Sequence, residues 1–122
     1  KYKDSRIDFF LSEHSSHADC FVEVKNVTLI DGDRALFPDS VSTRGQKHLR
    51  DLIEIKKQGL RACMMYVINR TDATSFSAAQ HIDPTYAELL REASDKGVEI
   101  LAYQCELSEE EIVLKSPIKV EL

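Results

Sequence analysis

Two charged residues in one strand-like run carry the clearest chemical signal in the sequence. The run contains Val22, Glu23, Val24 and Lys25 in that order. Because side chains of an extended strand alternate between faces, Glu23 and Lys25 point to one face and the valines to the other. Asp8 lies on the preceding strand-like run, and hairpin pairing would bring it beside this pair. The sequence thus predicts a small acidic and basic centre on a sheet.

The two carboxylates suit a hard divalent cation. Mg²⁺ prefers oxygen ligands and keeps several waters, so Asp8 and Glu23 are the predicted metal ligands, for Mg²⁺ or Mn²⁺, and the Val24 carbonyl could add a third. A bound metal lowers the pKa of a water and polarises a phosphoryl oxygen. Lys25 could then orient the water or neutralise charge on the phosphate. Asp8, Glu23 and Lys25 are the candidate catalytic residues.

An exposed ion pair is the alternative interpretation of Glu23 and Lys25. The pattern Glu-x-Lys occurs often by chance, and a surface ion pair contributes at most about 1 kcal/mol. The residues alone leave both interpretations open.

A cationic helix face is the second feature. Arg44, Lys47, His48 and Asp51 fall at spacings that share one helix face. Positive charge near a helix N-terminus suits phosphate, so Arg44, Lys47 and His48 are the candidate nucleic-acid contacts. Gly45 weakens a helix and suggests close backbone approach to a ligand or a strand. A solvated face is the alternative.

Hydrophobic periodicity predicts the elements that position these residues. The expected strands are residues 5–11, 20–29, 62–68 and 98–103, with short edge strands at 111–114 and 118–122. A helix is expected from Thr43 to Gly59, with Thr43 and Gln46 as a capping box. A second helix is expected from Asp83-Pro84 to Gly97. Helices that join consecutive strands imply right-handed crossovers, so we expect an α/β fold with a mixed central sheet and helices on both faces.

Composition limits the class of protein. The 122 residues suit one domain, 1–122, and no apolar run approaches the roughly 18 residues of a membrane span. Three widely spaced cysteines are expected to be buried thiols of a cytoplasmic protein. The formal net charge of −5 disfavours binding based on phosphate contacts alone, so we expect another domain to contribute part of the affinity for nucleic acid.

Two weaker candidates involve loop residues. His14, His17 and Cys20 have the spacing of zinc ligands, but no fourth ligand is near in sequence. Pro38-Asp39 is interpreted as turn chemistry, with Asp39 at the edge of the site as the alternative.

Several strings of residues resemble one known family. They are 5–9 (SRIDF), 22–29 (VEVKNVTL), 37–39 (FPD), 43–49 (TRGQKHL), 82–83 (ID), 86–90 (YAELL) and 97–103 (GVEILAY). Together they resemble the sugar fermentation stimulation protein family, SfsA, over nearly the whole chain.

The resemblance implies a PD-(D/E)xK nuclease-like domain with a restriction-endonuclease-like core. The motif's residues fall on Asp8, Glu23 and Lys25, although Ile7 stands where the motif has proline. The family carries an N-terminal OB-like domain, so we expect this chain to be the C-terminal part of a longer protein. The family is described as DNA-binding, as nuclease-like and as linked to sugar (maltose) metabolism.

Three functional hypotheses follow. The first is a Mg²⁺- or Mn²⁺-dependent nuclease acting on DNA, with RNA as the alternative substrate. The second is a non-catalytic DNA-binding regulator that keeps the nuclease fold. The third is an interaction or assembly domain. The expected partners are nucleic acid and the OB-like domain, with a homodimer left open and no membrane.

Overall fold

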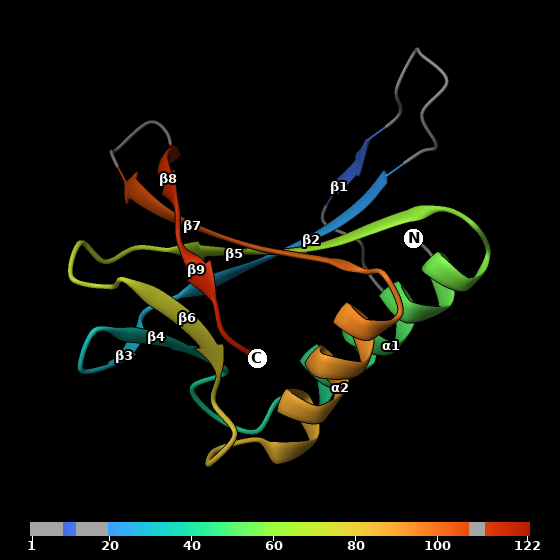
Figure 1. Cartoon of the computed structure of the whole chain (residues 1–122), viewed down its shortest axis with the longest axis horizontal. Coiled ribbons are helices and arrows are strands. Elements are labelled where there is room, and N and C mark those ends of the chain that lie inside the picture. Colours follow the sequence, from blue (N-terminus) through green and yellow to red (C-terminus); the bar gives the residue numbers. More distant parts are fainter. Residues whose placement is uncertain (1–8, 12–19, 108–111) are drawn as a thin grey trace.

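The computed structural model describes residues 9–11, 20–107 and 112–122. Its two helices and the strands of this part are shown in Figure 1. The elements, in chain order, are β1 (Phe9–Leu11), β2 (Cys20–Val27), β3 (Leu29–Asp31), β4 (Arg34–Phe37), α1 (Thr43–Lys57), β5 (Arg61–Ile68), β6 (Ser75–Ala78), α2 (Pro84–Asp95), β7 (Glu99–Leu107), β8 (Ile112–Pro117) and β9 (Lys119–Val120).

A five-stranded mixed sheet forms the centre of the molecule. Its order is β1-β2-β5-β7-β8. The three middle strands are parallel, and the two edge strands are antiparallel to their neighbours. β5 is buried along most of its length, as its continuous apolar sequence predicts for a strand covered on both faces. The predicted hairpin between β1 and β2 is confirmed for the described residues, with Phe9 opposite Val22.

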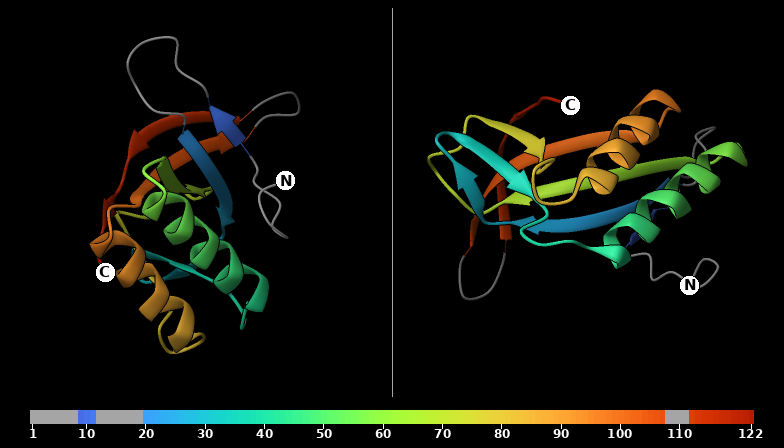
Figure 2. Two further views of the ribbon diagram at one scale, coloured as in Figure 1. Left: turned by 90° about the vertical axis from the view of Figure 1, so that its right-hand side faces the viewer. Right: turned by 90° about the horizontal axis from the view of Figure 1, so that it is seen from below.

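Both helices lie side by side against the same face of this sheet (Figure 2). The prediction of an α/β fold with a mixed central sheet flanked by helices is confirmed, but the expectation of helices on both faces is wrong. β2, β5 and β7 follow one another in a single direction across the sheet. Two crossovers of the same hand along one direction must place their helices on the same face.

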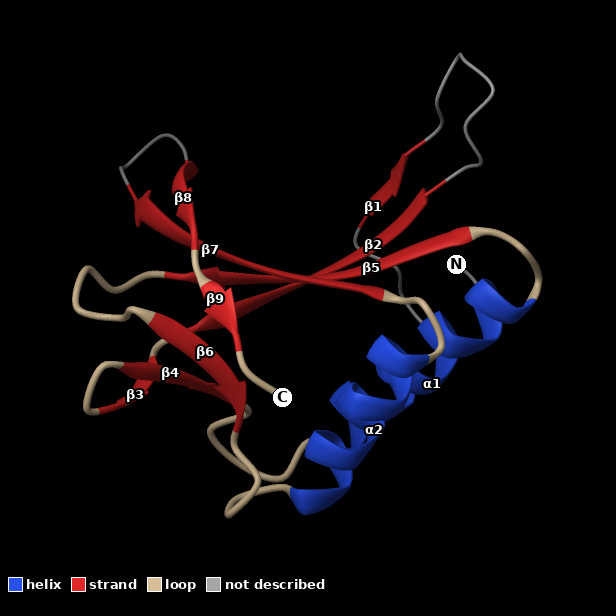
Figure 3. Ribbon diagram, viewed as in Figure 1, coloured by secondary structure: helices blue, strands red, loops and turns tan. Residues whose placement is uncertain are grey.

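A second sheet, unpredicted by the sequence, lies beside the helices (Figure 3). Its order is β3-β4-β6-β9. The run predicted as one strand over residues 20–29 divides at Thr28, so that β2 stays in the central sheet and β3 enters the second. The first crossover contains β3 and β4 before α1, and the second contains β6 before α2. These strands have four residues or fewer, too few to show a clear alternation.

Local capping signals predicted most of the helix ends. Asp83 caps α2, with Pro84 as its first residue. Gly59 and Gly97 follow the two helices with positive φ, where glycine is favoured. The capping box predicted at Thr43 is wrong, because Ser42 is the N-cap of α1 and accepts from the Gly45 N–H.

The main core lies between the two helices and the central sheet and extends to the second sheet. A smaller apolar cluster on the opposite face contains Cys20, Val22 and Cys63. All three cysteines, Cys105 included, are buried free thiols, as predicted. Neither described helix is long and apolar enough to cross a membrane.

Candidate functional site

Strand alternation places Glu23 and Lys25 as predicted, but in the interior. Their neighbour Val27 belongs to the core under the helices, whereas Val22 packs in the cluster on the opposite face. The Glu23 side chain is only 1% exposed and that of Lys25 16%. An exposed surface pair is therefore wrong as an interpretation. A buried carboxylate needs compensating partners, since an isolated buried charge is very costly.

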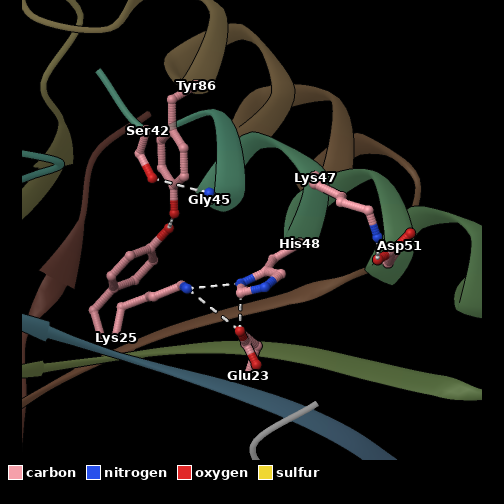
Figure 4. Close-up of polar contacts among 9 residues, drawn as sticks. Glu23, Lys25, Ser42, Gly45, Lys47, His48, Asp51 and Tyr86 are labelled. Atoms are coloured by element: carbon pink, nitrogen blue, oxygen red, sulfur yellow. Dashed lines mark hydrogen bonds and ion pairs between the residues drawn. The ribbon is translucent and has the colours of Figure 1, made fainter. Parts of the chain in front are cut away.

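The partners of Glu23 come from β2 and from α1 (Figure 4). Lys25 Nζ lies 3.3 Å from Glu23 Oε1, and His48 Nδ1 lies 2.5 Å from the same oxygen. Lys25 Nζ and His48 Nδ1 are 2.8 Å apart. The three side chains form a compact polar cluster, here called the Glu23 centre. Glu23 and His48 are both buried in this cluster, whereas Lys25 is partly exposed.

Two buried tyrosines lie next to the Glu23 centre. Tyr66 is the register partner of Lys25 on β5, so both side chains share the helix-covered face. Its hydroxyl lies 2.5 Å from that of Tyr86 on α2. Burial raises the pKa of Tyr86 well above its usual value, and the nearby negative charge of Glu23 raises it further. Both hydroxyls are therefore neutral hydrogen-bonding groups.

A second buried carboxylate, Asp83, joins the N-termini of the two helices. It accepts from the backbone N–H of Ser42 at 2.9 Å and from that of Tyr86 at 3.0 Å. The Gln46 side-chain amide lies 3.0 and 3.1 Å from its two oxygens. Asp83 is 1% exposed, so these donors are its compensation. The Asp83-Pro84 pair predicts the start of α2, but no sequence pattern indicates the link of Asp83 to α1.

Gly45 allows close contact between the two helices, not contact with a ligand or strand. A Cβ at this position would lie 2.7 Å from Ser42 Oγ and 3.1 Å from Tyr86 Cε2. The close approach suggested by the sequence is therefore real, but its partners are the helix cap and α2.

The predicted cationic face is divided by burial. Arg44 is exposed, as expected for a phosphate contact, and Lys47 is half-buried. Lys47 Nζ lies 3.5 Å from Asp51 Oδ2, and Asp51 is buried. His48 is 4% exposed and points to Glu23, so it belongs to the interior. A uniformly solvated face is therefore wrong.

The structure describes only some of the remaining candidates. Asp8, His14 and His17 lie outside the described residues. Asp39 is exposed in the loop before α1. Within the part of the chain that the structure describes, no group of three His, Cys, Asp or Glu residues could hold a metal ion. Of the two predicted metal ligands, Glu23 is the one that lies within the described residues.

Comparison with known proteins settles the family. The model of the family "Sugar fermentation stimulation protein RE domain" matches residues 1–111. The chain belongs to the SfsA family. A sugar fermentation stimulation protein homolog of Shewanella loihica is 49% identical over 120 residues, which cover 97% of this chain and 51% of that protein.

A solved structure gives the same result for the fold. The structure of Pyrococcus furiosus SfsA in complex with Ca²⁺ matches with a TM-score of 0.89 and 32% identity, over 100% of this chain and 52% of that chain. The present chain thus spans about half the length of these SfsA relatives. The resemblance to SfsA predicted from the sequence is confirmed.

Proposed function

We propose that this SfsA domain is a metal-dependent nuclease that hydrolyses phosphodiester bonds. The observation that carries the proposal is the burial of Glu23 beside Lys25 on the helix-covered face of the central sheet. Replacing a buried ion pair by apolar residues is often neutral or stabilising, so stability alone does not explain the presence of Glu23 and Lys25. Retaining a buried carboxylate and ammonium together is typical of sites that bind or transform charged ligands.

The donor chemistry of Glu23 fits a hard divalent cation. Carboxylate oxygens are the preferred ligands of Mg²⁺ and suit Mn²⁺, the metals we propose. The Pyrococcus furiosus relative was solved in complex with Ca²⁺, another cation that binds oxygen ligands. Asp8 remains our candidate for the second carboxylate. It precedes Phe9, and Phe9 pairs with Val22, the neighbour of Glu23.

The chain's own residues would divide the work as follows. Glu23 would hold the metal, which when bound supplies an activated water and charge stabilisation. Lys25 lies 3.3 Å from Glu23 and would neutralise charge that develops on the phosphate. The buried side chains of Tyr66 and Tyr86 lie next to this region, and the low dielectric of such surroundings would strengthen electrostatic interactions there.

Nucleic acid would reach the site along the first half of α1. Arg44 is exposed there, and Lys47 is half-buried one turn further on. DNA is the proposed substrate, with RNA as the alternative. Because the net charge is −5, we propose that an N-terminal OB-like domain of the longer protein supplies part of the affinity. The link to sugar metabolism would then act through nucleic-acid processing.

A cleavage assay tests the proposal. The natural protein that carries this domain is incubated with single-stranded DNA, duplex DNA and RNA, in Mg²⁺ or Mn²⁺ or with chelator. We expect metal-dependent cleavage, and loss of roughly 10²–10³-fold in rate for Lys25→Ala. Lys57→Ala, at the exposed end of α1, is the matched control. No cleavage of any substrate, or equal rates for Lys25→Ala and wild type, contradicts the proposal.

One observation favours a second candidate, a non-catalytic DNA-binding regulator that keeps the nuclease fold. Glu23 Oε1 already has two nitrogen partners in the Glu23 centre, so the cluster is electrostatically compensated without a metal. For this candidate, Glu23→Gln would leave the shift of a labelled oligonucleotide unchanged, and Mn²⁺ would not bind. Arg44→Ala with Lys47→Ala would weaken the shift under both candidates.

A further inference from the structure

His48 meets Glu23 and Lys25 through the same ring nitrogen. His48 Nδ1 lies 2.5 Å from Glu23 Oε1 and 2.8 Å from Lys25 Nζ. A single ring nitrogen cannot donate to a carboxylate and accept from an ammonium at the same time, because it either carries a proton or has a lone pair. One of the two contacts must therefore determine the state of the ring.

The shorter contact decides the assignment. A carboxylate oxygen and an unprotonated ring nitrogen at 2.5 Å would oppose two lone pairs. A charge-assisted N–H···O⁻ bond, by contrast, has a usual length of about 2.7–2.9 Å and is strengthened by burial. Nδ1 therefore carries a proton and donates to Glu23. Lys25 is then attracted by the carboxylate, at 3.3 Å, and not by the imidazole.

The helix that carries His48 has a firm position. Its N-terminus is tied to α2 through the bonds from Ser42 and Gln46 to the buried Asp83. Gly45 allows α2 to approach within van der Waals contact one turn before His48. A helix held by these contacts thus positions the imidazole beside Glu23. The His48 side chain is 5% exposed, so water competes little for its bond to Glu23.

We infer that His48 is the positioning residue of Glu23: it fixes the orientation in which the carboxylate meets a divalent cation. This inference rests on the proposed function. Holding a ligand in its binding orientation lowers the reorganisation needed when a metal arrives. Partners of this kind typically change metal affinity by roughly 10–100-fold. His48 would act through Glu23 and not by touching substrate, unlike its predicted role as a nucleic-acid contact.

Direct metal titration tests the inference without requiring catalysis. Mn²⁺ is titrated calorimetrically into the natural protein and its His48→Ala, His48→Gln and His81→Ala variants. We expect His48→Ala to weaken Mn²⁺ binding by roughly 10–100-fold. His48→Gln should recover part of the affinity, because its amide can still donate to Glu23. His81 is exposed in the loop before α2, so His81→Ala is the matched control and should bind like wild type.

A spectroscopic measurement keeps the test independent of the stability of these variants. In the metal-free wild type, proton NMR should show a protected Nδ1–H of His48 far downfield of the amide region. Glu23→Gln should shift this signal upfield or remove it, because the acceptor loses its charge. Absence of a protonated Nδ1 in the folded wild type overturns the inference.

The possible failures are distinguishable. Wild-type binding of Mn²⁺ with unchanged affinity in folded His48→Ala overturns the positioning role and leaves the proposed nuclease intact. The expected affinities without cleavage of any nucleic acid overturn the nuclease and support the positioning role. A wild type that binds no Mn²⁺ overturns both.

Discussion

Replacing the buried Asp83 by alanine should lower the free energy of unfolding more than replacing an exposed carboxylate of α2 does. The carboxylate is buried and compensated by three donor groups from two helices, the N–H groups of Ser42 and Tyr86 and the amide of Gln46. Alanine removes every acceptor. The Ser42 N–H and the Gln46 side-chain amide then remain in the interior without the acceptor that Asp83 provided.

The magnitude follows from these contacts. Loss of the N-cap interaction of α2 costs about 1 kcal/mol. The Ser42 N–H and the Gln46 amide each lose a partner at a cost of about 1–3 kcal/mol. Water entering the vacated space relieves part of this, so we expect a loss of roughly 3–5 kcal/mol. This is a large part of the roughly 5–15 kcal/mol that holds a domain folded.

Urea denaturation measures the effect. The free energy of unfolding of Asp83→Ala is compared with that of Asp95→Ala, which removes an exposed carboxylate from the other end of α2. The control should lie within about 0.5 kcal/mol of wild type. A difference in the free energy of unfolding below about 1 kcal/mol between the two variants would refute the proposed role of Asp83 in joining the two helices, because one ordinary hydrogen bond accounts for that much.

The same group gives a dependence on pH. Burial by itself raises the pKa of Asp83, but the bonds from Ser42, Tyr86 and Gln46 outweigh burial and hold the pKa below its usual value of 3.8. A carboxyl with a depressed pKa stabilises the folded state fully above its unfolded pKa and loses this contribution as the pH falls through the folded pKa. The stability gap between wild type and Asp83→Asn should therefore narrow below about pH 3.9.

Three further predictions concern neighbouring residues. Gly45→Ala should lower the free energy of unfolding by about 1 kcal/mol, because the clash of its Cβ with Ser42 outweighs the gain in helix propensity of about 1 kcal/mol; a higher melting temperature would contradict this. Tyr66→Phe should lower the free energy of unfolding by about 1–3 kcal/mol, because it leaves the Tyr86 hydroxyl without its partner. The double change Tyr66→Phe/Tyr86→Phe should lower it no further, as a double-mutant cycle can show. Burial raises the pKa of the Cys63 thiol to about 12. A thiol reagent at pH 8 should therefore modify Cys63 only after the protein is unfolded in urea, as mass spectrometry can detect. Rapid modification of the folded protein would argue against this burial.

The parts of the structure that were predictable depend on neighbouring residues. Alternation along one strand sufficed to place Glu23 and Lys25 on a common face. Glycine after a helix and the Asp-Pro pair before one mark ends through backbone conformation and capping, and Gly59 and Asp83 do so here. The helix cap at Ser42 was misplaced by one residue because Thr43 offers the same chemistry.

Burial was the property that residue type could not reveal. Arg44 and His48 share a helix face in the sequence pattern, yet Arg44 is exposed and His48 is buried, with 4% exposure. The difference arises because α1 packs against both the central sheet and α2, so that its polar residues have different neighbours. Likewise, strands as short as β6 show little pattern of their own and form only because β4 and β9 flank them.

The sequence by itself thus determined the α/β class, the SfsA resemblance and the pairing of Glu23 with Lys25, because each rests on spacing within one element or on matching strings of residues. Only the tertiary structure decided that this pair is buried, that His48 completes it and that Asp83 ties the two helices together. Glu23 and His48 stand 25 positions apart on different elements. Their meeting depends on the direction of a crossover and on the packing of α1 against β2, which long-range contacts determine.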